Sequence, residues 1–258
     1  MLLPDQVDKS LANTPPNTPP SSTVDVNVVK STPVRQTTAS SLTSKTRKSI
    51  GSLLENELEG ILHRDIPEFV DKFFGSRRVD PSVVDKIKRM LRTYPKDGAS
   101  EYHFYGSFIR LVNAISSNSS RSKLICHDKR PLKGGDALRK PDLLGVDGTL
   151  EITLPLNWCD IGFVVEFKPK LDMDSHKTDI QLASYAREVF GAQPSRRFVL
   201  GFTVCCTRMR LWLFDRSGGI SSEMFDIKEE TVKFVRVISG LINKNEIELG
   251  YDPTIKMP

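Results

Sequence analysis

Two acidic residues and a lysine, placed at the ends of two predicted strands, are the side chains in this sequence best suited to chemistry. Glu166 and Lys168 lie two residues apart near the end of the apolar run at 160–168, so both project from one face of a strand. Asp142 follows Pro141 at the start of the preceding predicted strand. Two carboxylates beside an ammonium group suit a hard divalent cation such as Mg²⁺. We therefore expect Asp142 and Glu166 as metal ligands and Lys168 as a catalytic group at a metal-activated water.

The two strands must bring these side chains together. If the strands pair antiparallel, the beginning of one meets the end of the other, and Asp142 approaches Glu166. Ile161, Phe163, Val164, Val165 and Phe167 make the second strand apolar on both faces, which indicates a buried central strand. Charged groups at the end of such a strand are costly to bury unless they are paired or bind something.

The order Pro141-Asp142, then Glu166-Phe167-Lys168, resembles the PD-(D/E)xK signature of a large nuclease-like superfamily. Gln181 and Tyr185, on a predicted helix after the strand, are similar to the Gln-x-x-x-Tyr element of its RecB-like branch. The resemblance implies a restriction-endonuclease-like core in which Asp142 and Glu166 bind Mg²⁺ and Lys168 is the catalytic lysine. Glu101, on an earlier helix, is a further acidic candidate by the same resemblance.

A structural explanation of these residues is also open. A Glu-x-Lys pair on a strand is often a surface salt bridge. Thr178 and Gln181 have the spacing of a capping box, in which Thr178 would cap the helix and Gln181 would bond back to it, leaving Tyr185 as a core residue. Trp158 and Trp212 are expected in the core, and Arg196-Arg197 fits either a phosphate contact or a solvated strand entry.

Periodicity predicts an α/β domain with a mixed β-sheet flanked by helices and preceded by a helical extension. In that extension Asp65 is expected to cap a helix, with Pro67 in its first turn and Glu68 closing a capping box. The expected helices span about 49–62, 66–74, 82–92, 101–116, 179–190 and 229–243. The expected strands span about 123–127, 141–146, 160–168, 198–206, 209–214 and 224–227.

Composition separates a tail from this domain. Residues 1–49 are rich in Ser, Thr and Pro and contain no aromatic residue, which predicts a disordered tail before an α/β domain at 50–258. Residues 1–50 hold six Lys and Arg against three Asp, so they carry three of the five net positive charges. The near-neutral remainder has no strong electrostatic footprint for nucleic acid. No apolar run is long enough for a signal peptide or membrane span, so we expect no membrane contact and a cytoplasmic or nuclear location.

Four ordered segments carry a second resemblance. Residues 181–190, 193–201, 210–219 and 249–255 are similar to the region that precedes the catalytic core in the fungal-type protein kinase family. The kinase parts themselves are missing from the sequence: there is no kinase Gly-rich loop, no Asp-Phe-Gly and no Val-Ala-Ile-Lys strand lysine. His63-Arg64-Asp65 matches the catalytic-loop triplet, but Val70 stands where that motif needs asparagine.

Three functions are consistent with these patterns. The first is a regulatory or recognition module of a fungal-type kinase protein, without a kinase core of its own. Its partner would be the kinase lobes in cis, where the full gene encodes them. The second is a magnesium-dependent phosphodiesterase or nuclease, for which nucleic acid would be the partner. The third is the leading fragment of an active Ser/Thr kinase. The regulatory or recognition module could also bind a separate protein as its partner.

Overall fold

The structure is a computed structural model that describes residues 54–75, 78–116, 120–126 and 130–255. All of these fall within one compact unit of the chain. The tail expected at residues 1–49 lies outside the described residues.

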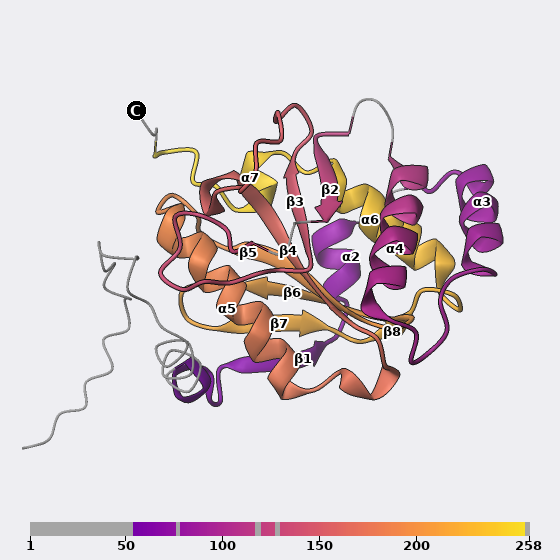
Figure 1. Cartoon of the computed structure of the whole chain (residues 1–258), viewed down its shortest axis with the longest axis horizontal. Helices are drawn as coiled ribbons and strands as arrows, with labels where there is room; N and C mark the ends of the chain where they lie inside the picture. The colour runs from indigo at the N-terminus through magenta and orange to yellow at the C-terminus, as the bar shows by residue number, and fades with distance from the viewer. Residues whose placement is uncertain (1–53, 76–77, 117–119, 127–129, 256–258) are drawn as a thin grey trace, which may run out of the picture. The chain divides into compact units, whose positions relative to one another are not determined.

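One mixed sheet of eight strands organises the described residues (Figure 1). Its order is β1-β7-β6-β5-β4-β3-β2, and the short β8 pairs with β6. The strands are β1 Leu62–Ile66, β2 Ser122–Cys126, β3 Leu143–Asp147, β4 Ile161–Lys168, β5 Val199–Cys205, β6 Arg208–Phe214, β7 Gly219–Ser222 and β8 Phe225–Asp226. The pairs β2–β3 and β3–β4 are antiparallel, whereas β4 and β5 run parallel and are connected through α5.

Helices cover both faces of this sheet (Figure 1). They are α2 Phe69–Phe74, α3 Pro81–Leu91, α4 Glu101–Ile115, α5 His176–Ala192, α6 Thr231–Ile242 and α7 Glu246–Leu249, with short 3-10 turns η2 Trp158–Asp160 and η3 Leu171–Met173. One face packs against α2, α3, α4 and α6 through a core that includes Phe108, Phe167 and Phe234. The other face packs against α5 through a smaller core that includes both tryptophans.

Local sequence explains most of these elements. Asp80 accepts the Ser82 backbone N–H at 2.8 Å and Pro81 occupies the first turn, so α3 begins there. In α4 the residues Phe104, Phe108, Leu111 and Val112 recur on one side and are buried. The strand β4 is buried on both faces up to Phe167, as its continuous apolar run predicts.

The N-terminal extension differs in part from the prediction: residues 54–58 are helical, within the helix expected at about 49–62, but the chain after them is not. Leu62–Ile66 is a strand that pairs in parallel with β7, although Leu58, Ile61 and Leu62 have helical spacing. The expected cap at Asp65 is also wrong, because α2 begins after Glu68, which has φ 58° and makes no side-chain cap bond. The strand β7 and the helix α7 were not predicted, and Cys206 lies in the β5–β6 turn instead of in a strand. No helix in the described part of the chain is long and apolar enough to cross a bilayer.

Candidate functional site

Strand register places Asp142 beside Glu166. Leu143 pairs with Val165 in the antiparallel β3–β4 ladder, so the residue before Leu143 faces the residue after Val165. The Asp142 carboxylate does not point into open solvent. Its Oδ2 accepts the backbone N–H of Phe167 at 2.8 Å, and its Oδ1 accepts the Tyr105 hydroxyl of α4 at 2.8 Å.

The other predicted site residues form a connected network with Glu166 at its centre. The Lys168 ammonium group donates to Glu166 Oε1 and, at 3.0 Å, to the Gln181 side-chain oxygen. The Tyr185 hydroxyl donates to Glu166 Oε2 at 2.9 Å, and Gln181 Nε2 donates to the Tyr185 oxygen at 2.9 Å. Glu166 is completely buried. We call Asp142, Glu166, Lys168, Gln181 and Tyr185 the signature cluster.

The capping-box explanation of Gln181 is wrong. The helix α5 begins at His176, after Ser175, so Thr178 lies inside the helix. The Thr178 hydroxyl donates to the Met173 carbonyl at 2.7 Å. Gln181 is therefore one turn into α5, where its amide reaches β4 through Lys168 and also bonds to Tyr185 on its own helix.

Tyr105 is a member of the site that sequence analysis missed. Its ring packs edge-on against Phe167 with centroids 5.7 Å apart, and its hydroxyl also lies 3.2 Å from Glu101 Oε2. Glu101 and Tyr105 are four residues apart on α4, so they share a helix face. Glu101, named by resemblance, thus reaches Asp142 only through Tyr105. The one available signal was the i, i+4 spacing of these two polar side chains on α4.

Burial and charge set the protonation of the cluster. Burial raises the pKa of Glu166 to about 8, and the Asp142 charge adds to this, while Lys168 and Tyr185 oppose it. Burial also raises the pKa of Asp142, against the Phe167 N–H, Tyr105 and Lys168. Burial alone would lower the pKa of Lys168, but the carboxylates of Glu166, Asp142 and Glu101 together raise it above its usual value. One cation is thus shared by two buried acids.

The oxygens that would hold a divalent ion are already hydrogen-bonded within the protein. All four carboxylate oxygens of Asp142 and Glu166 accept hydrogen bonds from protein donors. Mg²⁺ needs oxygen ligands in near-octahedral geometry and retains several waters, so an ion here would have to share these oxygens with their donors and have room for its waters. Within the described residues, no group of three or more His, Cys, Asp or Glu side chains is placed to hold a metal ion.

Arg196 has a structural role that neither interpretation of the sequence predicted. It is buried, and Nη2 donates to the Gly162 carbonyl at 2.8 Å while Nε donates to the Phe198 carbonyl at 3.2 Å. Its guanidinium also lies 4.5 Å from the centroid of the Tyr251 ring. The solvated strand entry and the phosphate contact are both excluded for Arg196, because its donors are used inside the protein. Trp158 and Trp212 are buried core residues, as predicted.

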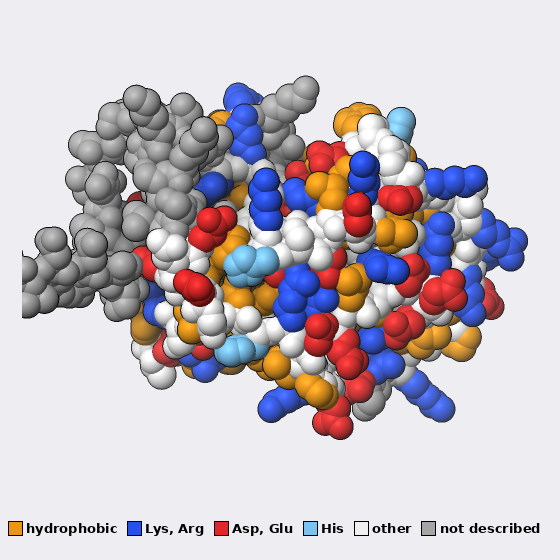
Figure 2. All heavy atoms as spheres, turned by 90° about the horizontal axis from the view of Figure 1, so that it is seen from below, with side chains coloured by type: hydrophobic (Ala, Val, Ile, Leu, Met, Phe, Trp, Pro, Cys, Tyr) orange, Lys and Arg blue, Asp and Glu red, His pale blue; other side chains and the backbone are white. Residues whose placement is uncertain are grey.

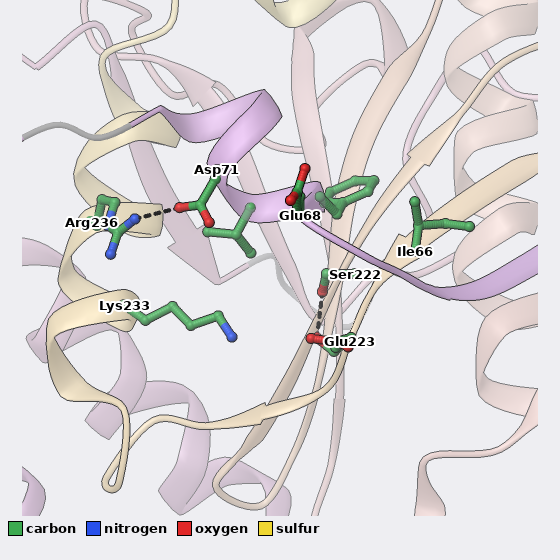
Figure 3. Close-up of a pocket in the computed structure, with 9 residues that line it drawn as sticks. Ile66, Glu68, Asp71, Ser222, Glu223, Lys233 and Arg236 are labelled. Carbon is green, nitrogen blue, oxygen red and sulfur yellow. Dashed lines mark hydrogen bonds and ion pairs between the residues drawn. The ribbon is translucent and has the colours of Figure 1, made fainter.

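A hollow of about 210 Å³ lies apart from the signature cluster (Figure 3). It is bordered by residues that include Glu68, Asp71, Glu223, Lys233 and Arg236. Arg236 is paired with Asp71 at 2.7 Å, and Lys233 points across the opening. Three acids and two cations line this hollow, and none of its lining residues belongs to the signature cluster.

The fold and site define an α/β domain whose mixed sheet carries a buried network of acids, lysine, glutamine and tyrosine. Comparison with known families adds one finding: residues 140–258 match the family model described as fungal protein kinase. The match includes every member of the signature cluster and covers a little less than half of the chain. A search of curated proteins returned no match.

Proposed function

We propose that this chain is a regulatory or recognition module of a fungal-type protein kinase protein. In this proposal the core is PD-(D/E)xK-like, and its signature residues hold the fold together instead of cleaving phosphodiesters. Kinase lobes in cis, where the full gene encodes them, are the proposed partner.

The topology supports the nuclease-like ancestry of the core. The chain order α4, β2, β3, β4, α5, β5 is the helix, three strands, helix, strand order of that superfamily. The signature residues occupy the corresponding elements: Asp142 precedes β3, Glu166 and Lys168 end β4, and Gln181 and Tyr185 lie on α5.

One observation carries the non-catalytic part of the proposal: every carboxylate oxygen of Asp142 and Glu166 already has a protein donor. A metal-dependent nuclease needs at least some of these oxygens for the ion that polarises the phosphoryl group and acidifies the attacking water. Here, an ion would have to use the remaining lone pairs of these oxygens inside a buried network, or displace the donors and leave them unsatisfied.

The kinase part rests on the family match together with the sequence. The matched region begins at Lys140 and contains none of the catalytic kinase motifs. The absence of these motifs from residues 140–258 supports a role beside the kinase lobes.

The convergence of Asp142, Glu166 and Lys168 at one place favours a second candidate, a magnesium-dependent nuclease. Surface charge does not add to it. On the face seen in Figure 2, Lys and Arg side chains alternate with Asp and Glu instead of forming a continuous basic track, whereas binding to the phosphate backbone depends on clustered cations.

A cleavage assay separates the two candidates. The purified chain is incubated with single-stranded DNA, double-stranded DNA and RNA in Mg²⁺ or Mn²⁺, beside Asp142→Asn, Glu166→Gln and the exposed-acid control Asp172→Asn. The proposal expects no cleavage by any of the four proteins. Cleavage that persists in Asp172→Asn but disappears in the two cluster variants, with their folds intact, would establish the nuclease instead.

A further inference from the structure

The edge strand β1 carries two charged side chains into a second buried network. Arg64 bonds to Asp179 of α5 at 2.7 Å and lies 3.4 Å from Asp174, which precedes α5. Asp65 pairs with Arg210 of β6 at 2.5 Å, and Arg210 also bonds to Asp174 at 3.0 Å. We call Arg64, Asp65, Asp174, Asp179 and Arg210 the clasp cluster.

We propose that β1 is a detachable clasp: its Arg64 and Asp65 hold the first turn of α5 in place, and its displacement from β7 loosens α5 and exposes the signature cluster. The proposal concerns how this domain switches between a closed and an open form. It does not depend on whether the chain belongs to a kinase or cleaves nucleic acid.

Burial in the clasp cluster is asymmetric. The side chains of Asp174, Asp179 and Arg210 are 7%, 1% and 4% exposed, whereas those of Arg64 and Asp65 are 29% and 56% exposed. The buried acids therefore depend on a cation supplied from the surface. If β1 left, Arg210 alone would face two buried carboxylates, and Asp179 would lose its ion-pair partner. An unpaired buried charge is strongly unfavourable, so the first turn of α5 must move when β1 does.

Asp179 is already poorly satisfied in the closed form. Its Oδ1 is buried and has no hydrogen-bond partner among the described residues. Burial raises its pKa, and Arg64 is the main group that opposes this. Asp179 and Gln181 are two residues apart on α5, so a shift at Asp179 moves the amide that holds Lys168.

The attachment of β1 to the sheet is weak. It pairs with β7 at three positions, with a register shift between His63 and Ile66, and none of its five residues is fully buried. Asp65 and Glu68 have φ values of 59° and 58°, a left-handed conformation that costs a non-glycine residue about 1 kcal/mol or more. Just before the strand, the Ile61 backbone also packs closely against Gly218. A Cβ added at Gly218 would lie 2.3 Å from the Ile61 carbonyl oxygen.

Hydrogen exchange in the unmodified chain tests the clasp first. If β1 is a clasp, the amides of 62–66 and 176–180 open together, in a step that leaves the central strand β5 protected. Opening of 62–66 without any exchange at 176–180 before global unfolding would overturn the proposal.

A pair of double variants provides the second test. Arg64→Gln/Asp65→Asn removes the clasp charges. Arg236→Gln/Asp71→Asn is the matched control, because it breaks another Arg–Asp pair of 2.7 Å whose arginine is 25% exposed. In the clasp variant we expect exchange at 176–182 to become about tenfold faster, with β5 unchanged, and Lys168 to be acetylated faster by an amine-reactive reagent. Neither change should occur in the control.

Two results would contradict the clasp. One is that exchange at 176–182 and Lys168 labelling stay at the wild-type rate when Arg64 and Asp65 are neutralised. The other is that they rise only in step with β5, since this would mean that the whole domain is destabilised and that β1 has no local control over α5.

Discussion

The two buried polar clusters of this domain both involve α5, but they obtain their counter-charges from different places. In the signature cluster the cation, the acids and the hydroxyl come from the interior of the sheet, from α5 and from the residue preceding β3. In the clasp cluster the buried acids Asp174 and Asp179 rely partly on Arg64 from a half-exposed edge strand. The same residue types can therefore form a permanent structural network, which we call a brace in the case of the signature cluster, or a movable contact. The difference is how firmly the fold holds the backbone that carries the cation.

The largest expected loss of stability comes from replacing Lys168 in the signature cluster. Above pH 8, where Glu166 is ionised, Lys168→Met leaves that buried carboxylate without a cation, and breaking a buried pair from one side costs about 3–5 kcal/mol. We expect urea unfolding to show a loss of this size, and Lys168→Met/Glu166→Gln to recover most of it. If the double variant is as unstable as the sum of the single variants, Lys168 and Glu166 are not coupled and the signature cluster is not a brace.

The pH dependence of the free energy of unfolding should report the ionisation of Glu166. Its pKa is about 8 in the folded chain and near 4.5 in the unfolded chain, so between these values the folded state binds more protons. The free energy of unfolding therefore falls as pH rises, by about 2 kcal/mol or more from pH 5 to pH 8. Glu166→Gln should lack this part of the slope in urea titrations. An unchanged slope in that variant would show that Glu166 is not the group responsible.

Breaking the clasp should be less costly than breaking the brace. Arg64→Gln keeps a polar side chain but removes the charge facing Asp179, and we expect a loss of about 1–2 kcal/mol in the free energy of unfolding. The control Arg236→Gln disrupts a pair whose aspartate is 69% exposed and should stay within about 0.5 kcal/mol of wild type. Equal losses in Lys168→Met and Arg64→Gln would remove the distinction between the clusters.

The smallest effect is expected at the rim of the signature cluster. Tyr105→Phe removes one hydrogen bond to Asp142, which keeps the Phe167 N–H, and the ring packing against Phe167 is preserved. Thermal unfolding should show a loss of about 0.5–1.5 kcal/mol. A larger loss would mean that Tyr105 supports the whole network and not only one carboxylate oxygen.

The sequence predicted the elements whose signals are local. The buried strand β4, the β5–β6 hairpin and the helices α3 and α4 were placed within a few residues because apolar runs and periodicity define them. The strand β1 was missed because Leu58, Ile61 and Leu62 also fit a helix, and its pairing with β7 is a long-range contact that no local pattern reports.

The site was predicted in its members but not in its connections. The strand register that brings Asp142 to Glu166 follows from antiparallel pairing. Gln181 was assigned two alternative roles, and only the true start of α5 at His176 decided between them. The contacts of Tyr105 and the second network around Arg210 both depend on tertiary packing, so residue types alone could not reveal them. In the second network, Arg210 and Asp65 are more than a hundred residues apart in the sequence.

A metal-dependent thermal shift tests the central claim most directly. The melting temperatures of wild type, Asp142→Asn and Glu166→Gln are measured with and without millimolar Mg²⁺ and Mn²⁺. An ion that binds only the folded state raises the melting temperature, and the rise grows with the logarithm of the free ion concentration once this exceeds Kd. Because the carboxylate oxygens are held by protein donors, we predict the same melting temperature with and without metal for wild type. A metal-induced rise in wild type that both variants lack would contradict the account.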